Sequence, residues 1–192
     1  MHIPKAWGGS GISLLAKVVI MEEFFNTAVP FPFAEVPNIL YECTGAQIDK
    51  YLKPCIEGEQ IAAFAQTEPD AGSDPGGMMK TSAVRDGKEW IISGTKMWIS
   101  HAETANFVLV QAVTDPVKRQ RGGITMFLVD RDNPGMKVET PGMPTWLDPV
   151  PSQYIVNFDN CRVPGDAVLG EVGKGFNLGQ SWLTIHDRLL RG

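Results

Sequence analysis

Apolar residues recur at helical spacing over residues 13–28, SLLAKVVIMEEFFNTA, near the start of the chain. Ser13 stands where a helix N-cap is expected, and the proline-rich VPFPF that follows predicts the end of this helix. Thr44-Gly45-Ala46-Gln47 has the Thr-x-x-Gln form of a capping box, and the helix after it is expected to reach Gly58, with an end or a kink at Pro54. Residues 1–60 are therefore predicted to be part of a helical domain.

After Glu59 the pattern changes to short runs rich in β-branched and aromatic residues, separated by dipeptides such as Asp-Gly and Ser-Gly. The runs are IAAFAQ, TSAVRD, EWIISG, TKMWIS, NFVLVQAV, GITMFLVD, MKVET and SQYIVNFD. Arg85-Asp86-Gly87-Lys88 is the clearest hairpin turn. The pattern is typical of an antiparallel β-barrel or sandwich, so we expect an α+β fold in which a middle domain over residues 61–168 is flanked by α-helical segments.

A helical pattern returns over residues 177–190, close to the end of the chain at Gly192. We expect residues 169–192 to be the start of a second helical domain that is cut short. The glycines in the preceding GEVGKGF are spaced G-x-x-G-x-G, whereas a dinucleotide-binding fingerprint needs G-x-G-x-x-G between a parallel strand and its helix. They predict a loop that leads into the last helix.

The composition is that of an ordinary globular protein, with 192 residues of which 43% are hydrophobic and 20% are charged. The net charge is -5 and the pI is near 5.2, so the molecule has no broad basic surface for a phosphate backbone. Nucleic-acid binding is therefore not expected. The one basic cluster, residues 118–121, lies between two apolar runs and is predicted to be a solvated hairpin tip.

The cysteines and histidines predict neither a disulfide framework nor a metal site. Cys43, Cys55 and Cys161 are odd in number and lack a Cys-x-x-Cys pair, which fits a reducing compartment. The histidines are far apart, and none has a second ligand at metal-binding spacing. Because the chain shows no secretory or transit pattern and no apolar run of membrane-spanning length, we expect a soluble, cytoplasmic protein.

One candidate site lies in AFAQTEPDAGSD, residues 63–74. Pro69 and Gly72 suit a tight turn, and a turn alone would explain most of this composition. It would not require the two hydroxyl groups, since Thr67 ends the apolar run and Ser73 stands at the exit of the turn. The segment is therefore a candidate for holding a ligand.

A second candidate is TKMWIS, residues 95–100. Strand alternation places the indole of Trp98 and the hydroxyl of Ser100 on one face. Taken alone, Trp98 is expected to be a core residue, because a strand commonly packs one aromatic ring into the interior. Its interpretation changes when the two segments are considered together.

Both segments resemble motifs of the acyl-CoA dehydrogenase family, and the other family motifs occur in the family's order. These are PKAWGG, AFAQTEPDAGSD, GTKMWIS, ITMFLVDRDNPG, FDNCRVP and LGEVGKGF. The resemblance implies a helical domain, a β domain and a second helical domain, with FAD bound between the last two. It also implies α,β-dehydrogenation of an acyl-CoA thioester, an electron-transfer flavoprotein or similar acceptor, and a homo-oligomer.

The resemblance also implies roles for individual residues. Thr67 would hydrogen-bond the flavin, together with backbone groups at Phe64 and Gln66. Trp98 would lie against the isoalloxazine ring, and Ser100 would reach its N5 side, with Ile99 on the same segment. In substrate binding, Ser73 would contact the acyl-CoA.

The catalytic base is not found at a matching position. The family's usual glutamate belongs to the C-terminal helical domain, but some members place the base on its first helix before an Arg-Leu pair, which makes Asp187 a candidate here. The sequence departs from the family at Gln66, where a small or apolar residue is usual, and at PTWLDPVPSQY. We expect an FAD-dependent acyl-CoA dehydrogenase; the alternatives are a non-catalytic flavin- or acyl-CoA-binding remnant or partner subunit, and an unliganded interaction barrel.

Overall fold

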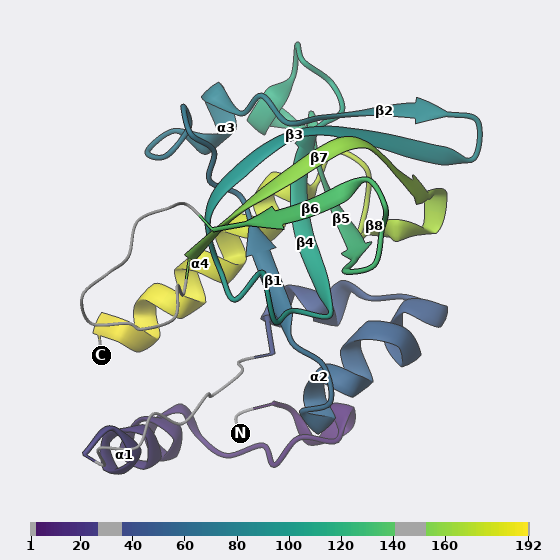
Figure 1. The fold of residues 1–192 in the computed structure, drawn as a ribbon. Helices are drawn as coiled ribbons and strands as arrows, with labels where there is room; N and C mark the ends of the chain where they lie inside the picture. The colour runs from purple at the N-terminus through teal and green to yellow at the C-terminus, as the bar shows by residue number, and fades with distance from the viewer. Residues whose placement is uncertain (1–2, 27–35, 141–152, 192) are drawn as a thin grey trace.

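The computed structural model describes residues 3–26, 36–140 and 153–191 (Figure 1). The side chains of Phe25 and of residues 185–191 lie outside this description. The helical segments are η1 (Lys5–Trp7), α1 (Leu14–Phe25), η2 (Asn38–Glu42), η3 (Ile48–Leu52), α2 (Lys53–Glu57), α3 (Pro75–Met78), η4 (Arg119–Arg121), η5 (Gly165–Ala167) and α4 (Gly175–Arg191). The strands are β1 (Ala62–Ala65), β2 (Ser82–Asp86), β3 (Glu89–Ser100), β4 (Phe107–Val113), β5 (Ile124–Asp130), β6 (Met136–Glu139), β7 (Gln153–Pro164) and β8 (Val168–Leu169).

The N-terminal helices follow their local sequence signals. Helix α1 begins directly after Ser13, whose hydroxyl accepts a 3.2 Å hydrogen bond from the backbone N–H of Ala16, as predicted for an N-cap. VPFPF lies outside the described residues. The second predicted helix is divided into the π-helix η3 and the α-helix α2, and Pro54 stands just after the division, where its missing N–H breaks the regular ladder. Gly58 then ends α2 with a φ of 81°.

The strands form one open sheet, which favours the sandwich over the barrel among the two expected forms, and its pairing is mixed where wholly antiparallel pairing was expected. The strand order is β6-β7-β3-β2-β4-β5-β8, with β1 added beside β4. Strand β1 runs parallel to β4, and β2 meets β4 through one parallel pair. Closing a barrel requires the two edge strands to pair, but among the described residues β6 pairs only with β7 and β8 only with β5.

The sheet folds over on itself, so the two-layer part of the prediction is correct. In Figure 1 strands β3, β6 and β7 cross over β4 and β5. Buried side chains from both layers fill the space between them, and Trp90 of β3 contacts Phe127 of β5 edge to face at 5.5 Å between ring centroids. The hairpin predicted at Arg85–Lys88 is confirmed, since Asp86 pairs with Glu89 across Gly87, whose φ is 61°.

The opposite face of β4 and β5 is covered by helical segments. Phe107 and Leu109 alternate with the inward-facing residues of β4 and pack against η2, α2 and Trp182 of α4. The loop before α4 is tied to the sheet because the N–H of Gly173 donates to Thr125 Oγ1 at 2.9 Å. The predicted loop and the last helix are therefore confirmed. Among the helices in the described part of the chain, none is long and apolar enough to cross a membrane.

Candidate functional site

The turn that follows β1 is closed by its own backbone. The N–H of Glu68 donates to the carbonyl oxygen of Ala71 at 3.2 Å, and the N–H of Ala71 donates back to Glu68 at 3.1 Å. The turn then passes into α3, where Asp74 Oδ1 accepts from the N–H of Gly77 at 2.9 Å. The turn chemistry recognised in the sequence therefore accounts for the backbone of this loop but leaves Thr67 and Ser73 without a role in it.

The two candidate segments lie next to each other in the fold. The N–H of Met97, in β3, donates to the carbonyl oxygen of Thr67 at 2.9 Å. One residue earlier on each segment, Lys96 Nζ donates to the carbonyl oxygen of Gln66 at 3.1 Å. The structure thus brings together AFAQTEPDAGSD and TKMWIS, which are separated in sequence.

A buried ion pair joins the same segments, and sequence reasoning missed it. Lys96 is completely buried and Glu68 is nearly so, with Lys96 Nζ 2.9 Å from Glu68 Oε1. Glu68 also accepts from the backbone N–H of Thr81 at 3.0 Å and of Lys80 at 2.6 Å. The sequence carried one usable signal, which is that a lysine inside an apolar strand requires a buried anion.

The charges of this pair follow from its surroundings. Burial alone would raise the pKa of Glu68, but the Lys96 ammonium and the hydrogen bonds from Thr81 and Lys80 outweigh it, so the pKa lies below its ordinary value. Burial lowers the pKa of Lys96 to about 8, against the opposing attraction of Glu68. Both groups are therefore charged at neutral pH, and each neutralises the other.

Trp98 lies on the surface, whereas the strand considered alone predicts a core residue at this position. Its side chain is 43% exposed and its φ is 61°, a left-handed conformation that is rare for a bulky residue. The pairing of β3 with β7 shifts register between Lys96 and Ile99, so a bulge aims Trp98 outward. Ile99 is buried in the core, so only its backbone is available to a ligand.

The other predicted site residues differ in solvent exposure and in whether their polar groups are hydrogen-bonded within the protein. Ser100 is exposed, and its hydroxyl accepts a 2.9 Å hydrogen bond from Gln153 Nε2. Ser73 is exposed, Thr67 is half-buried, and within the described residues neither hydroxyl has a hydrogen-bond partner. Gln66 is buried, and its Nε2 lacks an acceptor in the same part of the chain. Phe64 is half-buried and belongs to the apolar core between the sheet and the helical segments, together with Leu109 of β4 and Leu178 of α4.

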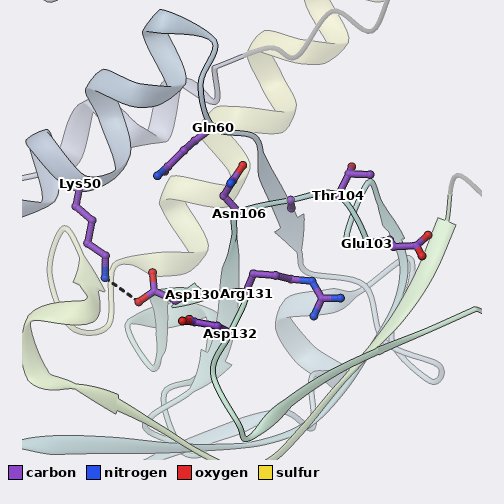
Figure 2. Close-up of a pocket in the computed structure, with 9 residues that line it drawn as sticks. Lys50, Gln60, Glu103, Thr104, Asn106, Asp130, Arg131 and Asp132 are labelled. Atoms are coloured by element: carbon purple, nitrogen blue, oxygen red, sulfur yellow. Dashed lines mark hydrogen bonds and ion pairs between the residues drawn. The ribbon is translucent and has the colours of Figure 1, made fainter.

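A separate polar pocket of about 590 Å³ lies between η3, the connection from β3 to β4 and the end of β5 (Figure 2). Lys50 Nζ and Asp130 Oδ2 face each other there at 2.7 Å, and Tyr51 donates to the same carboxylate. Its lining residues are Lys50, Gln60, Glu103, Thr104, Ala105, Asn106, Asp130, Arg131 and Asp132. None of the residues expected to contact flavin or substrate is among them.

The remaining candidates add no further centre. Asp187 lies in the last part of α4, and its side chain is outside the described residues. Cys43, Cys55 and Cys161 are buried free thiols, and burial raises the pKa of Cys161 to about 11. Over residues 3–26, 36–140 and 153–184 the His, Cys, Asp and Glu side chains form no group of three or more that could hold a metal ion.

The fold is that of an α+β protein with an open β-domain. In this domain the segment Gln66–Glu68 is hydrogen-bonded to strand β3 beside its bulge. Residues 63–161 match the acyl-CoA dehydrogenase middle domain, and residues 1–59 match the acyl-CoA dehydrogenase N-terminal domain. The chain belongs to the acyl-CoA dehydrogenase family.

The matching relatives are about twice as long as the chain. It is 37% identical over 191 residues to (R)-benzylsuccinyl-CoA dehydrogenase of Thauera aromatica, covering 92% of the chain and 45% of the relative. It is 37% identical to the caffeyl-CoA reductase-Etf complex subunit CarC of Acetobacterium woodii, covering 96% of the chain and 50% of the relative. A solved acyl-CoA dehydrogenase from Geobacillus kaustophilus superimposes with a TM-score of 0.84 at 30% identity, covering 98% of the chain and 51% of that structure.

Proposed function

We propose that the chain is the FAD- and acyl-CoA-binding part of an acyl-CoA dehydrogenase, which removes hydrogen from the α and β carbons of an acyl-CoA thioester. In this proposal residues 1–60 and 169–192 belong to helical domains, and residues 61–168 form the binding domain. The observation that carries it is the clamp between Gln66–Glu68 and Lys96–Trp98. These two hydrogen-bonded segments present the exposed indole of Trp98 and the Thr67 hydroxyl, which has no hydrogen-bond partner among the described residues.

The groups at this clamp fit a flavin. Bound FAD would supply the hydride acceptor that no side chain can provide. The carbonyl oxygens of Gln66 and Thr67 are already occupied by β3, so hydrogen bonds to a ligand are left to the Thr67 hydroxyl and to N–H groups. Such donors stabilise the negative charge that a reduced ring carries, and Trp98 would form an apolar wall that positions the ring and excludes water.

We assign Ser73 to the substrate side, because it is exposed and stands beyond the closed turn Glu68–Ala71. The partners in this proposal are an acyl-CoA thioester and an electron-transfer flavoprotein, since one relative is named as a subunit of an Etf complex. We also propose that the protein forms a homo-oligomer. A cytoplasmic location is proposed because the described cysteines are free thiols.

The proposal is tested with the protein expressed from its complete reading frame. It should purify yellow or take up FAD, and anaerobic addition of the correct acyl-CoA should bleach the oxidised flavin band. The panel should include aromatic as well as saturated acyl-CoAs, because relatives are named for benzylsuccinyl-CoA and caffeyl-CoA. FAD uptake without bleaching by any acyl-CoA would favour a non-catalytic binding protein, and a colourless protein that never takes up FAD would favour an interaction domain.

Ser73→Ala is expected to raise the KM for acyl-CoA by about 3- to 10-fold, which is the effect of losing one hydrogen bond of about 1 kcal/mol. The Kd for FAD should change by less than about twofold, because in this proposal Ser73, beyond the closed turn Glu68–Ala71, contacts the substrate and not the flavin. Steady-state kinetics and a flavin titration measure the two constants. Ser93→Ala, on β3, is the matched control, and equal losses in both constants would contradict the assignment of Ser73 to substrate.

Asp187→Asn is expected to change the rate of flavin reduction by less than about twofold. An aspartate is one methylene shorter than the family's glutamate, and a base must lie within hydrogen-bond reach of the proton that it removes. Anaerobic stopped-flow reduction measures the rate, with flavin affinity as the check on folding. A fall of about 100-fold or more would identify Asp187 as the base, because general-base catalysis contributes at least this much.

A further inference from the structure

The buried pair Glu68–Lys96 joins the two segments of the clamp to the backbone that leads into β2. Lys96 Nζ reaches the carbonyl oxygen of Gln66 at 3.1 Å and Glu68 Oε1 at 2.9 Å. The Glu68 carboxylate in turn holds the N–H groups of Lys80 and Thr81, which lead into β2. Three separate stretches of chain are thus joined through two side chains.

These bonds stand immediately beside the groups proposed to bind flavin. Thr67 lies between Gln66 and Glu68, and both of these neighbours are held by Lys96. Trp98 follows Lys96 by two residues and lies where the register of β3 shifts. The position of the Thr67 hydroxyl relative to the Trp98 indole therefore depends on the two ends of this ion pair.

We propose that Glu68 and Lys96 are positioning residues, which set the separation between Thr67 and Trp98 and so hold the flavin-binding surface in its binding conformation. The inference rests on the proposed function. Neither residue contacts the ligand in this proposal, because Lys96 is completely buried and Glu68 is 4% exposed.

Stability alone does not account for a pair of this kind. Replacing a buried ion pair by apolar side chains of similar size is often neutral or stabilising, because desolvation offsets the attraction between the charges. What apolar side chains cannot reproduce is direction, since each bond of Lys96 and Glu68 is aimed at one particular backbone or carboxylate atom. A binding surface needs its groups held to within about 0.5 Å, and directional bonds provide that precision.

The test separates position from stability with three variants of the protein expressed from its complete reading frame. Lys96→Met removes the donor to the Gln66 carbonyl and leaves Glu68 without its cation. The double variant Glu68→Gln/Lys96→Met leaves no unpaired charge but still lacks that donor. Ile92→Ala is the control, because Ile92 is fully buried in the same strand and has no bond to the clamp.

Each variant is titrated with FAD at a temperature where all are folded, and the shape of the flavin absorption band is recorded. We expect Lys96→Met to raise the Kd for FAD by about tenfold or more, equivalent to about 1.4 kcal/mol, and to change the band. The double variant should recover part of the lost thermal stability without recovering FAD affinity. Ile92→Ala should lose stability while its Kd stays within about twofold of the parent.

Two results would overturn the inference while leaving the proposed function intact. The first is that the parent protein and the Lys96→Met variant bind FAD with the same Kd and show the same shape of the flavin absorption band. The other is a loss of FAD affinity that follows thermal stability across all three variants, including Ile92→Ala. A parent protein that takes up no FAD would instead refute the proposed function, and this inference with it.

Discussion

Gly94→Ala is expected to lower the free energy of unfolding by about 3 kcal/mol, through steric overlap and backbone strain together. Gly94 has a φ of 147°, which side-chain-bearing residues rarely adopt. A Cβ at this position would stand 2.5 Å from Thr81 Oγ1 and 2.6 Å from Thr81 Cα. Urea unfolding followed by circular dichroism measures the loss.

The same substitution should also disturb the candidate site, because Thr81 donates its N–H to Glu68. Gly87→Ala is the matched control. Gly87 has a φ of 61°, but nothing lies within 4 Å of the position that an alanine methyl group would take, so only the backbone strain of about 1 kcal/mol is expected there. Equal losses at the two positions would show that the backbone around Thr81 shifts to accommodate the added methyl group, so that its hydrogen bond to Glu68 does not fix its position.

Trp98→Ala is expected to raise the Kd for FAD by about 30-fold, equivalent to about 2 kcal/mol, because an aromatic wall contributes both buried area and ring stacking. The free energy of unfolding should change by less than about 0.5 kcal/mol, since the indole is 43% exposed. A residue held at a φ of 61° on a bulge also indicates a functional constraint on this position. Flavin titration by absorbance measures the affinity.

Trp98→Phe should retain most of the flavin affinity, because it keeps a flat apolar ring at the same place. Val84→Ala, at an exposed apolar residue of the neighbouring strand β2, controls for the loss of surface hydrophobic area and should leave flavin binding unchanged. If Trp98→Ala retains parental affinity and an unchanged flavin spectrum, Trp98 is no part of the flavin site.

The elements that sequence analysis predicted correctly are those whose signals are local. The Ser13 cap, the hairpin at Asp86-Gly87 and the loop before α4 each depend on a few neighbouring residues. The two segments with candidate chemistry were also recognisable, because turn residues and hydroxyls are visible along the chain. The parallel pairing of β1 with β4 was not predicted, since pairing between distant strands leaves no local signal.

The sequence by itself determined the helices at the two ends and the β-rich middle, because backbone propensity and periodicity act over short distances. Only the tertiary structure decided that Trp98 faces outward and that Lys96 is buried against Glu68. Strand alternation alone predicts neither, because a bulge shifts the register of β3 and because a lysine enters a core only where the fold supplies an anion. These two facts depend on chain segments that meet only after folding.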